Sequence, residues 1–158
     1  SPDFTIWHAR WQREQFVASN WLLKTTFIGQ KASKALFASE EFGVGGPDLG
    51  RAYDNSEITG DDGLAGALEI SFTGVPPFKQ MTFIPSVFYD IGNVWNQNSG
   101  QADGLSIAAA GAGLRINHPS GVNSRLTIAL PLTRAIDTPV QGNNGKNLRI
   151  FFQIGYTF

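Results

Sequence analysis

The chain has 158 residues, with 12 basic and 13 acidic side chains and a formal net charge of −1. Neutralising several phosphates needs a clustered excess of Lys and Arg, so this balance argues against a nucleic-acid partner. Because the sequence has no cysteine, it has no disulfide framework, thiolate metal site or cysteine nucleophile. No apolar run approaches the roughly 18 residues of a membrane helix, and no basic-then-apolar export signal opens the sequence.

Alternation of apolar and polar residues predicts seven strands with turns between them, at 3–16, 20–30, 64–72, 80–94, 105–116, 125–133 and 148–158. The last segment shows the pattern most cleanly, because one of its faces carries Leu148, Ile150, Phe152, Ile154, Tyr156 and Phe158. Its length matches a tilted strand that crosses a bilayer, which needs about 9–11 residues. The sequence therefore predicts an all-β, antiparallel architecture.

Alternation alone does not decide which face meets water, so a soluble barrel or sandwich that binds a ligand stays open. Two features favour a membrane barrel. The predicted strands are longer than the usual 5–6 residues of soluble sheets. Aromatic residues also fall near predicted strand ends, as in interfacial girdles: Trp21, Tyr89, Trp95, Tyr156 and Phe158. Seven strands leave two open edges, so we expect residues 1–158 to form one part of a larger transmembrane barrel.

A long segment at about 32–63 interrupts the alternation and gathers glycines at positions 43, 45, 46 and 50. Loops of this length within compact domains are usually functional or disordered. Its acidic residues lack the regular spacing of a calcium loop, and we interpret them as a solvated loop: Asp54, Glu57, Asp61 and Asp62. Asp48 stands where a phosphate-binding glycine motif would need its last glycine, so no phosphate site is predicted.

Two motifs carry a resemblance to a known family. The loop contains Leu49, Gly50, Arg51, Ala52 and Tyr53, and a later predicted strand contains Phe88, Asp90 and Gly92. The pair resembles the two-partner secretion transporters, or haemolysin secretion/activation proteins. In that family a Val-Arg-Gly-Tyr or Val-Arg-Gly-Phe tip lies on a loop folded into the barrel, and Phe-x-Asp-x-Gly lies on the wall. Here Ala52 stands at the motif's glycine. Alternation also puts Glu69 on a polar face, where it could be a second partner of the arginine.

The resemblance implies a role and a setting for the chain. It implies an outer-membrane pore that moves a partner exoprotein, of haemolysin or adhesin type, from the periplasm to the cell surface. It also implies a sixteen-stranded parent barrel, of which residues 1–158 would be the carboxyl-terminal part, with periplasmic domains before it. A loop arginine paired with Asp90 and a lipid bilayer around the wall are implied as well. The terminal residues resemble the signal that the outer-membrane assembly machinery reads, namely Phe152, Ile154, Tyr156 and Phe158.

Other interpretations stay open on the sequence. An assembly or insertion factor of the same superfamily shares both motifs, and a small soluble or porin-like binding barrel would lack the inward loop. Arg51 could be an exposed loop arginine, and residues 90–93 could form a turn at the end of a strand. His8 and His118 are the only histidines and no Gly-x-Ser-x-Gly elbow exists, so we expect no enzymatic activity, no cofactor and no metal.

Overall fold

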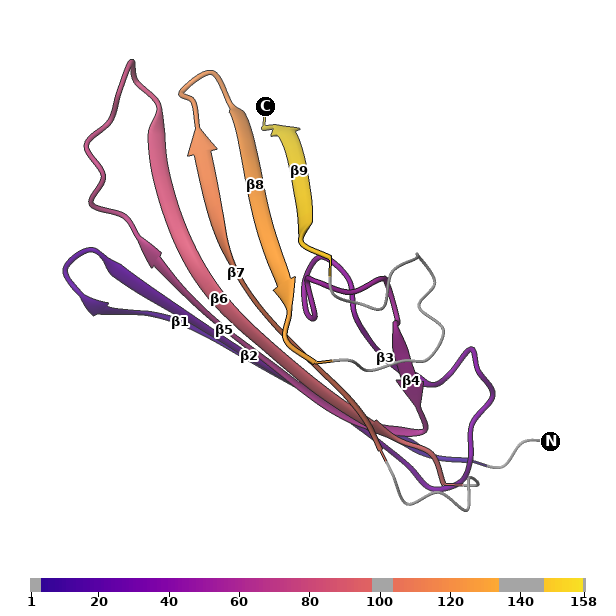
Figure 1. The fold of residues 1–158 in the computed structure, drawn as a ribbon. Helices are drawn as coiled ribbons and strands as arrows, with labels where there is room; N and C mark the ends of the chain where they lie inside the picture. The colour runs from indigo at the N-terminus through magenta and orange to yellow at the C-terminus, as the bar shows by residue number, and fades with distance from the viewer. Residues whose placement is uncertain (1–3, 98–103, 134–146, 158) are drawn as a thin grey trace.

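The computed structural model describes residues 4–97, 104–133 and 147–157, and these form an all-β architecture (Figure 1). No helix in this part of the chain has the length and hydropathy needed to cross a membrane. A seven-stranded antiparallel sheet has the order β1-β2-β5-β6-β7-β8-β9. Its strands are β1 (Ile6–Ala18), β2 (Trp21–Ala32), β5 (Asp62–Phe72), β6 (Thr82–Trp95), β7 (Leu105–Asn117), β8 (Val122–Pro131) and β9 (Arg149–Tyr156). The seven predicted strands are therefore confirmed.

The sheet is strongly curved and is not closed (Figure 1). Among the described residues, β1 pairs only with β2 and β9 only with β8, so both edges are open. The strands run to 14 residues in β6, longer than is usual in soluble sheets. This is the shape of a barrel wall rather than of a whole barrel, as the odd strand count predicted.

The convex face of the sheet is apolar and exposed. One row of paired residues across the sheet runs Leu68, Tyr89, Ala110, Leu130. The three large side chains in it, Leu68, Tyr89 and Leu130, are 47%, 42% and 47% exposed. A row shifted by one residue carries Thr26, Asp90 and Ala109 on the opposite face. Large apolar side chains exposed across a whole face mark a surface that contacts an apolar partner.

The aromatic positions agree with the expected girdles only in part. Trp21, Trp95 and Tyr156 each lie at the end of a strand. Tyr89 does not, because it lies in the middle of β6, where its ring belongs to the apolar outer face. The expectation for Tyr89 was therefore wrong. Phe158 lies outside the described residues.

A second, two-stranded sheet lies on the concave side of the wall (Figure 1). It consists of β3 (Phe42–Val44) and β4 (Ile58–Gly60), which the sequence pattern did not predict. The buried core forms between this hairpin and the wall, where Val44, Ile58, Val94 and Ile107 are each 1% exposed. Small wall residues, including Ala65, Ala109 and Ala129, allow the hairpin to approach closely.

Candidate functional site

The segment between β2 and β5 folds back over the concave face, and its tip spans residues 45–57 (Figure 1). Gly50 adopts a left-handed φ of 78°, and a Cβ there would lie 3.0 Å from the Gly45 Cα. Ala52 is not among the residues with positive φ. The tight turn therefore lies one residue before Arg51, and alanine fits where the family motif has glycine.

The carboxylate of Asp90 binds the tip of the loop. Its Oδ2 accepts hydrogen bonds from the backbone amides of Gly50 and Arg51 and from Arg51 Nε, each at 3.0 Å. Its Oδ1 accepts from Arg51 Nη2 at 2.8 Å. Asp90 lies inside β6 and is 0% exposed, and Arg51 is 8% exposed. A two-pronged arginine–carboxylate pair with two added amide donors is both strong and geometrically specific.

Glu69 and Phe88 complete the surroundings of the guanidinium. Arg51 Nη1 donates to Glu69 Oε2, and the Arg51 Cζ lies 3.5 Å from the centre of the Phe88 ring. Burial alone would lower the pKa of the Arg51 guanidinium, but the hydrogen bonds and charges of Asp90 and Glu69 raise that pKa above its ordinary value. The arginine is therefore charged, stacked on a ring and paired with two carboxylates. An exposed loop arginine and a strand-end turn at Asp90 are both contradicted.

The other side of the tip contacts the last strands. The Tyr53 hydroxyl lies 3.1 Å from the Ala108 carbonyl oxygen and also contacts the carbonyl of Thr133. Asp54 forms an ion pair with Arg149 of β9. Burial raises the pKa of the Glu57 carboxyl, and the nearby Asp54 carboxylate adds to this increase. The tip thus bridges β5 and β6 on one side to β7 and β9 on the other.

The family model for haemolysin secretion/activation protein ShlB/FhaC/HecB matches residues 1–116, which include both the loop motif and the Asp90 motif. The chain belongs to this family. The resemblance seen in the sequence is therefore confirmed. The protein is also similar to the heme/hemopexin transporter protein HuxB of Haemophilus influenzae, with 26% identity over 140 residues that cover 85% of this chain. HuxB of strain 86-028NP is 25% identical over 140 residues. The chain spans 25% of the length of these relatives.

For this member of the ShlB/FhaC/HecB family, the acidic part of the loop is not the solvated loop that we expected. Asp61 and Asp62 are only 4% and 8% exposed, and Asp54 is tied to Arg149. Asp61 and Asp62 are buried because the ends of β2, β5 and β6 meet around them. The spacing of acidic residues along the sequence does not reveal this. The part of the chain that the structure describes contains no group of three His, Cys, Asp or Glu side chains that could hold a metal ion.

Two contacts of the site were missed by the sequence analysis. Arg149 falls on the polar face of the last predicted strand, so alternation alone could have placed it inside the wall. Thr133 follows the end of β8, and nothing in the sequence around it indicated its contact with Tyr53. Of the expected terminal signal, Phe152, Ile154 and Tyr156 are 67%, 70% and 57% exposed on β9. Their role in assembly stays a prediction.

Replacing Phe88 by leucine tests the ring beneath Arg51. The Phe88→Leu substitution keeps an apolar side chain but removes the cation–π contact, which contributes about 0.5–2 kcal/mol. Arg51 is itself a trypsin site, and its burial means that cleavage there requires the tip to leave the wall. We expect trypsin to cut after Arg51 about 2–30-fold faster in this variant. An unchanged cleavage rate would show that the ring only fills space.

Proposed function

We propose that this chain is part of an outer-membrane pore that carries a partner exoprotein from the periplasm to the cell surface. The family match and the convex apolar face support this location. The concave face is suited to line a passage, because it carries charged side chains and holds a folded loop. The partner, the surrounding lipid and contact with the assembly machinery during biogenesis belong to this proposal.

The observation that carries the proposal is the attachment of the loop tip to Asp90. Four hydrogen bonds from Gly50 and Arg51 to Asp90, together with the stacked Phe88 ring, hold the tip against the wall, so the loop occupies the concave side in a defined position. In the proposed mechanism the loop sets the shape of the passage. Direction comes from the partner, which enters the pore unfolded and folds outside the cell.

The class of the partner is the finer part of the proposal. We propose a β-rich exoprotein of haemolysin or adhesin type. The two H. influenzae relatives are named for heme and hemopexin, so a partner that handles these ligands belongs among the cargoes to be tested.

Depletion of the full-length protein in its own organism tests the function. A secretion pore serves its partner, so we expect one exoprotein to disappear from the cell surface and medium while other outer-membrane proteins keep their normal levels. Loss of many outer-membrane proteins would instead indicate an insertion factor. Fractionation gives a second check, because a protein that stays in solution without detergent would contradict the membrane location.

A further inference from the structure

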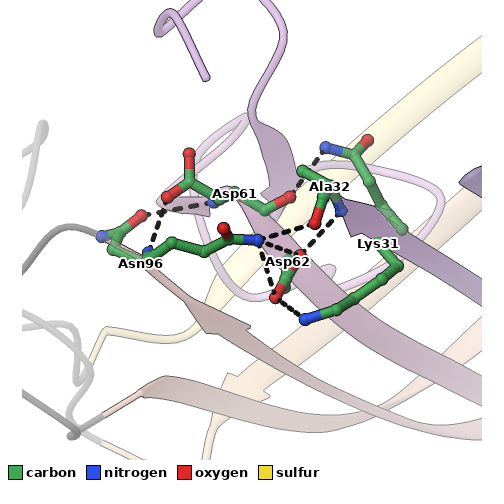
Figure 2. Close-up of polar contacts among 7 residues, drawn as sticks. Lys31, Ala32, Asp61, Asp62 and Asn96 are labelled. Atoms are coloured by element: carbon green, nitrogen blue, oxygen red, sulfur yellow. Dashed lines mark hydrogen bonds and ion pairs between the residues drawn. The ribbon is translucent and has the colours of Figure 1, made fainter. Parts of the chain in front are cut away.

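A second polar cluster lies at the base of the loop, away from Arg51. Figure 2 shows Lys31 and Ala32 from the end of β2, Asp62 from the start of β5 with Asp61 just before it, and Asn96 from just beyond β6. Hydrogen bonds join these residues across three strand ends. Nothing in the family motifs points to this cluster, and its carboxylates belong to the segment that the sequence predicted to be solvated.

Asp61 ties the segment that enters the loop to the segment that follows β6. Its Oδ1 accepts a hydrogen bond from the Leu36 amide at 2.6 Å, and its Oδ2 accepts from the Gln97 amide at 2.7 Å. Its own amide donates to Asn96 Oδ1 at 3.3 Å, a contact visible in Figure 2. Gln30 Nε2 donates to the carbonyls of Asp61 and Glu40. A single aspartate thus fixes the start and the end of the loop to the neighbouring strand.

Asp62 adds a second set of bonds at the same place. Its Oδ1 accepts from the Ala32 amide at 2.8 Å, and its Oδ2 pairs with Lys31 (Figure 2). Gln97 Nε2 donates to the Ala32 carbonyl at 2.7 Å. The carboxylates are nearly buried, with residue exposures of 4% for Asp61 and 8% for Asp62. Losing a buried acceptor of this kind leaves its amide donors without partners, which is costly.

The base cluster and the tip contact share no residue. Asp62 pairs with Trp95 across the sheet, whereas Asp90 lies five residues earlier on the same strand. At about 3.4 Å per residue, the two positions are roughly 17 Å apart along β6. Groups separated by more than about 7–10 Å, with no shared partner, usually act independently.

We propose that Asp61 and Asp62 are positioning residues that hold the base of the loop independently of the Arg51 contact. Loss of the contact between Arg51 and Asp90 then loosens the tip while residues 61–62 stay fixed to the wall. The inference rests on the geometry of the loop and does not depend on which partner passes beside it.

Amide hydrogen exchange on the full-length protein in lipid nanodiscs separates the two attachments. In an Asp61→Ala, Asp62→Ala variant we expect residues 33–44 to exchange about tenfold faster, while the tip at 50–54 changes by less than about twofold. Asp90→Ala should give the reverse pattern. Equal acceleration of both segments in each variant would overturn the proposal, and so would unchanged exchange at 33–44 when both aspartates are replaced.

The conservative Asp61→Asn, Asp62→Asn variant distinguishes positioning from a general loss of stability. An asparagine side chain keeps one oxygen that can accept a hydrogen bond from a backbone amide, so the bonds from the Leu36 amide to position 61 and from the Ala32 amide to position 62 can form again. We expect amide exchange at 33–44 in this variant to be slower than in the double alanine variant, with the tip at 50–54 unchanged. Exchange at 33–44 as fast as in the double alanine variant would contradict the role.

Discussion

Replacing Asp90 by alanine should release the loop tip and raise trypsin cleavage after Arg51 by at least about a hundredfold, because removing one partner of a buried ion pair costs about 3–5 kcal/mol. The carboxylate is 0% exposed and accepts all four hydrogen bonds that fix the tip to β6. Its loss leaves two backbone amides and most of the guanidinium without acceptors. Cleavage of the full-length protein in outer-membrane vesicles measures the effect.

Glu69→Gln is the matched control for that substitution. Glu69 accepts one hydrogen bond from Arg51, and its side chain is 17% exposed. Glutamine keeps an oxygen that can accept this bond and removes only the charge, so trypsin cleavage after Arg51 should rise far less than in Asp90→Ala. The exposed site at Lys34, which lies outside the strands, serves as an internal reference for trypsin activity. Equal cleavage after Arg51 in both variants would show that the tip does not depend on Asp90 in particular.

Replacing Gly92 by leucine should push the β3–β4 hairpin away from the wall. A Cβ at this position would lie 2.5 Å from the Val44 Cγ1 and 3.2 Å from the Val44 Cβ, and Val44 is 1% exposed. Overpacking of a filled core costs about 1–3 kcal/mol. We therefore expect faster amide exchange in residues 42–44 and 58–60 and weaker export of the partner. The glycine of the wall motif is thus explained by close approach.

Two further variants make this test specific. Gly29→Ala adds a Cβ at an ordinary 3.5 Å from Leu64 Cδ1 on the outer face, so it should change neither exchange nor export. Val44→Ala combined with Gly92→Ala should recover near-normal exchange, because it removes the methyl group that the new Cβ would strike. If the combination exchanges as fast as Gly92→Leu, the account of this contact is wrong.

The fold was predictable because each strand of a wall has one apolar and one polar face. The alternation of Ile150, Phe152 and Ile154 follows directly from that requirement, and the exposed outer face of β9 agrees with it. The separate expectation of aromatic girdles misplaced Tyr89, since an apolar face carries aromatic residues in the middle of a strand as well as at its ends. The alternation of apolar and polar residues gives the face of the sheet on which a side chain lies, but not its position along the strand.

The site was predictable only where a motif supplied long-range information. The resemblance linked Arg51 to Asp90, which lie 39 positions apart, and the structure brings them into contact. No motif covers Asp61 and Asp62, whose burial depends on where the ends of β2, β5 and β6 meet. The β3–β4 hairpin was missed for a different reason. Each of its strands has only three residues, too few for alternation to show.

A double-mutant cycle on export tests the central claim that Arg51 and Asp90 act as one contact holding the loop in the pore. The amount of partner at the cell surface would be measured for the full-length protein, for Arg51→Ala, for Asp90→Ala and for both together, at equal levels of inserted barrel. We predict that each single variant exports poorly and that the double variant is no worse than either single one. Normal export by both single variants, or losses that multiply in the double variant, would contradict the account.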